Sequence, residues 1–353
     1  MPSPQSAPLV GTLFHAIGAT SAALCYSPQR FLRRWSWQTY WILQASACWL
    51  VLPWVFAWAT VPQLSAVLHE APGSAMERSY LLGVLYGVGG IAFGLAIRYV
   101  GFSLTYAIAI GVSCVLGTLL PPLLAGTLAA TLASTAGTFV VSGVVLGSFA
   151  MLATGLAGFR KEREVSSGGG AGSFNPRVGL PVCFLAGALS AVFNFSLIAG
   201  QPIADVAALH GAGNFQGNVI YIFSNSGAFT TTLIYAGWLA TRGRTWSEFV
   251  RIPEGGGLLR NYLLALATGL MWYLQFFFYG LGHVRMGRFE FSSWAIHMIL
   301  LIMLSCGFGV AIGEWRACRP VTKLLITVAI ALLLGAVGLI SYGNYIATPA
   351  ASA

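Results

Sequence analysis

GLMWYLQFFFYGLGH, residues Gly269–His283, closes a long hydrophobic segment that also carries polar side chains. At helical pitch, four of its side chains lie close to one line along the helix: Trp272, Gln275, Tyr279 and His283. A helix that faces only lipid offers no partner to an amide or an imidazole, and an unpaired polar group is costly in hydrocarbon. The stripe therefore faces other protein or a water-filled cavity. It is either a hydrogen-bonded seam between helices or a wall that contacts a solute.

The composition predicts an all-α polytopic membrane protein. Of the 353 residues, 57% are hydrophobic and 8% are charged, whereas soluble domains carry about 25% charged residues. The net charge of +9 comes from single basic residues in short loops, so nucleic acid is not an expected partner. The six cysteines form no C-x-x-C pair, which argues against a disulfide framework. The N-terminus lacks a basic signal-peptide region, so we expect the first span to be retained.

Ten segments approach the roughly 20 apolar residues that a membrane-spanning helix needs. They cover approximately residues 9–27, 38–60, 79–99, 102–127, 137–158, 178–199, 216–241, 259–283, 290–313 and 321–346. With these spans, fifteen of the 18 Lys and Arg residues fall on one side of the membrane. The positive-inside rule makes that side cytoplasmic and places both termini on the non-cytoplasmic side of the cell inner membrane.

The two halves of the chain resemble each other. GATSA in the first span (Gly18–Ala22) has a counterpart in GALSA in the sixth (Gly187–Ala191), and Phe-Ser opens both the fourth and the ninth spans. We therefore expect one five-helix repeat over residues 1–158 and a second over residues 178–353, joined by a cytoplasmic linker at residues 159–177. Because five is odd, the second repeat is inverted, as in many transporters. Small residues also recur by chance in packed helices, which is the alternative.

Glycines in the third span predict close helix packing. Gly90 and Gly94 are four residues apart, and Gly87 precedes Gly90 by three, so all three share one side of a helix. Such small residues let two helix backbones approach each other.

An enzyme is not expected from this sequence. No carboxylate lies near the middle of a predicted span, and no His, Asp or Glu cluster has the spacing of metal ligands. The serines also lack a G-x-S-x-G setting. We expect neither a cofactor nor a bound metal.

Three histidines and one carboxylate are candidates for proton handling. His15, His283 and His297 all fall in the outer half of predicted spans, and Glu290 opens the ninth span. Histidine is the side chain whose unperturbed pKa lies nearest physiological pH, which suits a group that titrates as its exposure changes. A structural hydrogen bond at a helix interface remains the alternative for each histidine.

Uncharged polar side chains are candidates for solute contacts. Asn194 lies on a polar face of the sixth span and Asn225 on one of the seventh, while Tyr26 shares the face of His15. Together with Trp272, Gln275 and Tyr279, they suit a small neutral sugar or polyol, since an anion site would need buried Arg or Lys. Hydrogen bonding between helices is the alternative.

Several segments resemble the bacterial L-rhamnose–proton symporter family. They include GLMWYLQFFFYGLGHVR (Gly269–Arg285), SSWAIHM (Ser292–Met298), GEWRACRPVT (Gly313–Thr322) and HAIGATSAALCYSP (His15–Pro28). WSWQTYW (Trp35–Trp41) and LPW (Leu52–Trp54) match as well, whereas the sixth and seventh spans (Val178–Arg242) match only loosely.

The resemblance implies ten helices in two inverted halves of the drug/metabolite transporter superfamily, with sugar–proton symport across the inner membrane by alternating access. The expected substrate is a monosaccharide, most simply L-rhamnose. Two alternatives stay open: a transporter of the same superfamily for another sugar or small metabolite, and a membrane sensor that transports nothing. The sequence does not decide the exact sugar, the coupling stoichiometry or the oligomeric state.

Overall fold

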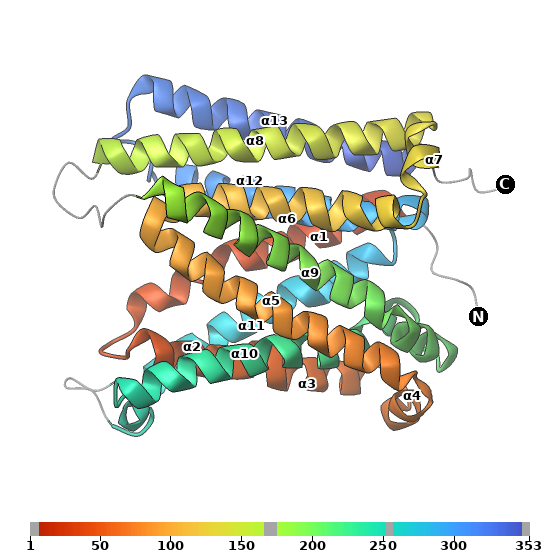
Figure 1. Cartoon of the computed structure of the whole chain (residues 1–353), viewed down its shortest axis with the longest axis horizontal. Coiled ribbons are helices and arrows are strands. Elements are labelled where there is room, and N and C mark those ends of the chain that lie inside the picture. Colours follow the sequence, from red (N-terminus) through yellow and green to blue (C-terminus); the bar gives the residue numbers. More distant parts are fainter. Residues whose placement is uncertain (1–6, 166–174, 252–256, 348–353) are drawn as a thin grey trace. The chain divides into compact units, whose positions relative to one another are not determined.

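The computed structural model describes residues 7–165, 175–251 and 257–347, and every regular element in these ranges is a helix (Figure 1). The helices of the first half of the chain are α1 (Pro8–Leu24), α2 (Trp37–Ala45), α3 (Leu52–Thr60), α4 (Leu64–Glu70), α5 (Gly73–Val100), α6 (Phe102–Leu124), α7 (Leu128–Leu132) and α8 (Thr135–Val165). Those of the second half are α9 (Pro176–Leu209), α10 (Ile220–Arg242), α11 (Leu258–His283), α12 (Ser293–Ala311) and α13 (Pro320–Ala347).

The prediction of a polytopic helical membrane protein is confirmed. Within the described ranges, nine stretches are long and apolar enough to cross a membrane. The predicted seventh span, residues 216–241, forms the short helix η3 (Gly213–Val219) followed by α10, and it is not among the nine. The amide and hydroxyl side chains of α10 dilute its apolar residues, so the count of ten spans stays a prediction.

Part of the predicted linker, residues 159–177, lies in helices. Helix α8 continues through the charged residues 159–165 and ends at Val165, and α9 begins at Pro176. The glycine-rich residues 166–174 lie outside the described ranges. The predicted fourth span, residues 102–127, contains α6, which ends at Leu124.

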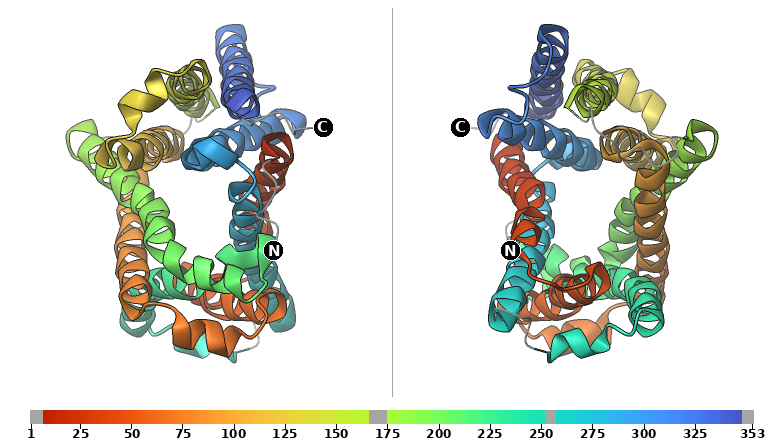
Figure 2. Two further views of the ribbon diagram at one scale, coloured as in Figure 1. Left: turned by 90° about the vertical axis from the view of Figure 1, so that its right-hand side faces the viewer. Right: turned by 90° about the vertical axis from the view of Figure 1, so that its left-hand side faces the viewer.

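The chain divides into two compact units, and each unit draws on both halves of the sequence. The first consists of Ser21–Val88 and Phe195–Gly280, and the second of Pro4–Thr20, Gly89–Asn194 and Leu281–Ala353. Helices α1, α5, α9 and α11 therefore contribute residues to both units. Within the second unit, α8 and α13 lie side by side (Figure 2).

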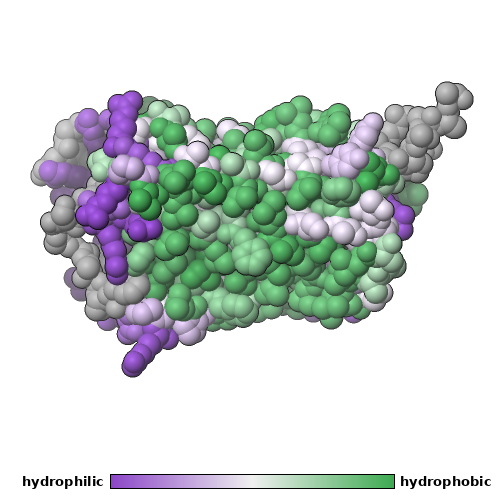
Figure 3. Space-filling model, turned by 90° about the horizontal axis from the view of Figure 1, so that it is seen from above, coloured by the Kyte–Doolittle hydropathy of each residue, from purple (hydrophilic) through white to green (hydrophobic). Residues whose placement is uncertain are grey.

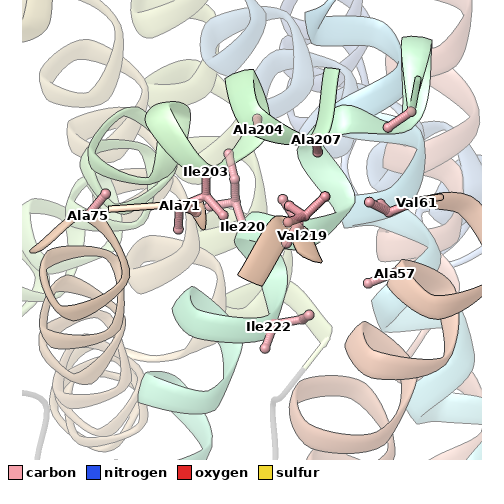
Figure 4. Packing of buried hydrophobic residues seen from close by; sticks show 12 residues of the cluster. Ala57, Val61, Ala71, Ala75, Ile203, Ala204, Ala207, Val219, Ile220 and Ile222 are labelled. Carbon is pink, nitrogen blue, oxygen red and sulfur yellow. The ribbon is translucent and has the colours of Figure 1, made fainter. Parts of the chain in front are cut away.

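In the first unit, α2 and α3 pack against α10, and α5 crosses α10 at glycines. A Cβ atom on Gly83 would lie against the carbonyl oxygen of Ser224, and one on Gly227 against that of Tyr80. Beyond this crossing, α3, α4, α9 and α10 enclose a cluster of buried alanine, valine and isoleucine side chains (Figure 4).

The glycine face predicted for the third span is only partly correct. Gly87 does pack closely, since its Cβ would lie 2.8 Å from that of Thr231, but Cβ atoms on Gly90 and Gly94 would meet nothing within 4 Å. Both of these glycines are exposed and face away from the helix contact. The close-packing pair at the α10 crossing is Gly83 and Gly87, seven residues before Gly90 and Gly94.

In the second unit, α8 runs along α13, and α6 contacts α8 and α12. Glycine again allows the approach, because a Cβ on Gly143 would lie 2.8 Å from the carbonyl oxygen of Ala336. One end of this packing carries the ion pair between Lys161 and Glu314, at 2.7 Å. On the face shown in Figure 3, hydrophobic residues cover the middle, and hydrophilic residues gather at the ends, most of them at one. This distribution is typical of a membrane-spanning surface.

Substitution of Gly83 by alanine tests the α5–α10 crossing. The new Cβ has no room beside the Ser224 carbonyl, so we expect Gly83→Ala to lower the free energy of unfolding by about 1–3 kcal/mol, as overpacking does. Gly90→Ala is the matched control on the same helix, because its Cβ meets nothing within 4 Å. Thermal unfolding in detergent measures both, and equal midpoints would contradict the crossing.

Candidate functional site

The second membrane span contains a π-helical turn. Helix α2 passes into η2 (Ser46–Val51), a π-helix, and α3 follows from Leu52. Pro53 has no N–H to donate to the carbonyl of Trp49, so the regular α-helical bond is lost at that point. Widened turns of this kind are rare and occur frequently at functional sites. The turn buries Trp49 in the first unit.

An aromatic cluster surrounds Trp272 in the first unit. We define the aromatic cluster as Tyr26, Trp41, Trp49, Tyr86 and Trp272. The ring of Trp272 lies 5.2 Å from Tyr26, 5.6 Å from Trp41 and 5.4 Å from Trp49, in each case edge to face. Tyr86 on α5 joins through Trp49, at 6.4 Å. The structure thus brings together two of the predicted solute contacts, Tyr26 and Trp272.

The sequence analysis missed three members of this cluster. Trp41 was named only as part of the WSWQTYW segment. Trp49 was not singled out, because the π turn shifts the helical register that a periodicity argument assumes. Tyr86 stands between Gly83 and Gly87 in a glycine-rich helix. A bulky side chain among glycines is a signal that could have identified it.

The other predicted contacts on α11 and α10 are buried in the same unit. Gln275 and Tyr279 follow Trp272 by three and seven residues and are 9% and 4% exposed. Beside them, the hydroxyl of Tyr221 donates to the carbonyl of Phe276 at 2.8 Å. Asn225 is fully buried on α10. Its side-chain oxygen Oδ1 accepts a long hydrogen bond of 3.4 Å from the Ser224 hydroxyl.

Asn194, by contrast, belongs to the second unit. Its amide nitrogen donates to the carbonyl of Gly117 on α6, at 2.8 Å. This bond matches the alternative interpretation of Asn194, in which polar residues of the sixth span hold helices together.

The predicted proton-handling residues gather in the second unit. We call His15, His283 and His297 the histidine cluster. The rings of His15 and His297 meet edge to face with centroids 5.9 Å apart, and both residues are buried. His283 is hydrogen-bonded through Nδ1 to the hydroxyl of Ser293, at 3.1 Å. Glu290 is exposed in the short helix η5 (Gly287–Ser292) and interacts electrostatically with His283.

Two close contacts fix the histidine cluster in place. Gly282 allows α1 to approach α11, because a Cβ there would lie 2.8 Å from Nε2 of His15. Trp294 fastens α12 to α6 by donating from Nε1 to the Ser113 carbonyl, at 3.0 Å. His297 lies one turn further along α12. Neither Ser293 nor Trp294 was identified from the sequence as a residue of this site.

The histidine cluster is not arranged as a metal site. In the part of the chain that the structure describes, no three His, Cys, Asp or Glu side chains are placed to hold a metal ion. The histidine cluster therefore provides titratable side chains, but its described residues do not form a set of metal ligands.

Comparison with known proteins supplies the family. A family model described as L-rhamnose-proton symport protein matches residues 5–344. The L-rhamnose-proton symporter of Cronobacter sakazakii (strain ATCC BAA-894) is 33% identical over 328 residues, which cover 89% of this chain and 92% of that protein. The proteins of the same name from Shigella dysenteriae serotype 1 (strain Sd197) and Yersinia pestis (strain Pestoides F) are 31% and 30% identical, and the matches cover 89% and 93% of this chain and 92% and 96% of those proteins.

Proposed function

Because the chain belongs to the family of L-rhamnose-proton symport proteins, we propose that it carries L-rhamnose together with protons across the cytoplasmic membrane. The observation that carries this conclusion is the family match, which runs through nearly the whole chain. It confirms the resemblance found in the sequence, and it makes the protein a transporter and not an enzyme.

The aromatic cluster supports a role in sugar binding. Edge-to-face rings around Trp272 offer apolar surfaces on which a sugar ring can pack. In our proposal Trp272 and Tyr26 contact the apolar face of the sugar, and Gln275, Tyr279 and Asn225 contact its hydroxyls. None of these side chains is charged, which suits a neutral solute. Asn194 stays in the proposed set, although its contact with the sugar would have to replace its bond to Gly117.

The histidine cluster supports a role in proton coupling. His15 and His297 are in ring contact, and His283 lies beside the exposed carboxylate of Glu290. In our proposal Glu290 and His283 exchange the proton with the outer solution, and His15 and His297 receive it in the interior. A carrier of this kind needs such groups to titrate as their exposure changes.

Matching helix contacts support ten helices in two inverted halves. If the halves are duplicates, α6 corresponds to α12 and α8 to α13. In the second unit α6 contacts α8, and α12 correspondingly contacts α13. The serines that follow phenylalanine correspond as well. Ser103 donates to Glu162 on α8 at 2.7 Å, and Ser292 accepts from Asn344 on α13 at 2.9 Å. The first bond joins the start of the fourth span to the end of the fifth. The second joins the start of the ninth span to the end of the tenth. This agreement is expected of alternating access by inverted repeats.

A reporter tests the proposed orientation. The basic residues place both termini outside the cytoplasm. Alkaline phosphatase fused to the C-terminus should therefore be active in intact cells, whereas the same enzyme inserted at residues 166–174 should be inactive. The reverse pattern of activity would show that both termini are cytoplasmic and that the proposed orientation is wrong.

Uptake into right-side-out vesicles tests the proposed function. Labelled L-rhamnose should accumulate when an inward proton gradient is imposed, and a protonophore should abolish the accumulation. Folded protein that carries no L-rhamnose but exchanges another sugar in a counterflow panel would favour the related alternative, a transporter of the same family type for a different solute.

Loss of the proposed proton groups should separate accumulation from exchange. We expect His297→Ala and Glu290→Gln to abolish gradient-driven accumulation while counterflow of L-rhamnose continues, because exchange needs no net proton movement. His210→Gln is the control. His210 is paired with Glu70 at 2.8 Å and Gln63 at 3.1 Å in the first unit, whereas the histidine cluster belongs to the second. Parental accumulation in either test variant would remove that residue from the coupling set.

A further inference from the structure

Four buried polar side chains of the first unit hold hydrogen-bonding atoms that have no partner among the described residues. We call them the polar set: Gln44, Trp49, Asn225 and Tyr273. The unpaired atoms are both amide atoms of Gln44, the indole Nε1 of Trp49, the amide nitrogen of Asn225 and the hydroxyl of Tyr273. Their side chains are 0%, 4%, 0% and 0% exposed. Buried polar groups are paired in nearly all native structures, so each exception needs an explanation.

Two other buried tyrosine hydroxyls of the same unit are paired. Tyr40 donates to Thr268 at 2.8 Å, and Tyr221 donates to the carbonyl of Phe276 at 2.8 Å. These bonds are what a structural seam between membrane helices requires. The polar set does not follow this pattern, although its members lie on the same helices. Their hydrogen-bonding capacity is therefore not used to hold the helices together.

Gln44 lies where α2 crosses α11. It occupies the face of α2 between Tyr40 and Cys48, and all three residues are fully buried. Gly269 of α11 sits against this face, since a Cβ there would lie 2.7 Å from the carbonyl oxygen of Gln44. Trp272 and Tyr273 follow one turn after Gly269 on α11. Gln44 thus lies at the contact of α2 with α11, one turn of α11 before Trp272 and Tyr273.

The remaining members border the aromatic cluster. Trp49 is itself part of it, with its ring 5.4 Å from that of Trp272. The ring of Tyr273 lies 6.4 Å from that of Tyr221, and Asn225 is one turn beyond Tyr221 on α10. Helices α2, η2, α10 and α11 of the first unit therefore each contribute one member of the polar set.

We infer that Gln44, Trp49, Asn225 and Tyr273 form the hydroxyl-recognition subsite for the neutral sugar, an inference that rests on the proposed function. A primary amide presents an acceptor and two donors, which suits two adjacent sugar hydroxyls. The indole and the Asn225 amide add donors, and the phenol can donate or accept. A site built to hydrogen-bond a substrate hydroxyl also rejects analogues that lack it, because its own buried groups are then left unpaired.

Two buried tyrosines on neighbouring helices provide a matched test. Tyr273 and Tyr40 are both fully buried, but only the Tyr40 hydroxyl is paired. We expect Tyr273→Phe to leave the thermal unfolding midpoint of the sugar-free protein unchanged and to raise the KM for L-rhamnose counterflow about fivefold, the loss of one hydrogen bond. Tyr40→Phe should do the opposite, lowering the midpoint while leaving KM at the parental value.

A second pair of variants on α2 tests the amide. Gln44→Met keeps the length of the side chain and removes its unpaired polar atoms, so we expect an unchanged or higher unfolding midpoint and a KM raised at least about tenfold. Gln38→Met is its control, because Gln38 is paired with Thr245 at 3.1 Å. Counterflow is the assay, since it does not depend on proton coupling.

Three results would overturn the inference. Parental KM values in both Gln44→Met and Tyr273→Phe would show that the polar set does not contact the sugar. A fall in the unfolding midpoint of Tyr273→Phe as large as that of Tyr40→Phe would show that its hydroxyl is a structural donor. A parent protein that neither exchanges nor is stabilised by L-rhamnose would overturn the proposed function itself, and that result is visible before any variant is made.

Discussion

The cost of an unpaired polar group in hydrocarbon decides how this chain is organised. Lipid supplies no hydrogen bonds, so each buried amide, hydroxyl or imidazole must find a partner inside the protein or serve a solute. Most do find partners, as Asn194 does with Gly117 and Trp294 with Ser113. Glycines make these contacts possible, because they bring helix backbones close enough for short side chains to reach across. The polar atoms left over then mark the places where function is to be sought.

The two compact units differ in the chemistry that they hold. The first unit holds the aromatic cluster and the uncharged polar set, which suit a neutral ligand that both packs against rings and forms hydrogen bonds. The second unit holds the histidine cluster and the neighbouring carboxylate of Glu290. Residues from both sequence halves contribute to each unit.

Composition and hydropathy predicted the helices well, because a span of given length must be apolar to cross a membrane. Helix faces and residue types also identified Tyr26, Trp272 and the three histidines as candidate site residues. They could not find Trp49, since the π turn before Pro53 breaks the periodicity on which the argument relied. Helical spacing correctly predicted that Gly87 on α5 packs closely, but it wrongly predicted the same for Gly90 and Gly94. The sequence does not distinguish a glycine that faces lipid from one that faces another helix. Whether Gln44 has a partner is a property of the neighbouring helices and cannot be seen in its own sequence.

Under the proposed function, coupling between the two chemistries has a defined route. Helix α11 carries Trp272 in the first unit and His283 in the second, eleven residues apart and thus about 16 Å along the helix. The first span likewise carries His15 in the second unit and ends near Tyr26 in the first. In the proposal, the proton and the sugar therefore bind to different residues of the same two helices. Each instead favours particular positions of the same two helices, and linkage then requires that each ligand change the affinity for the other by the same factor.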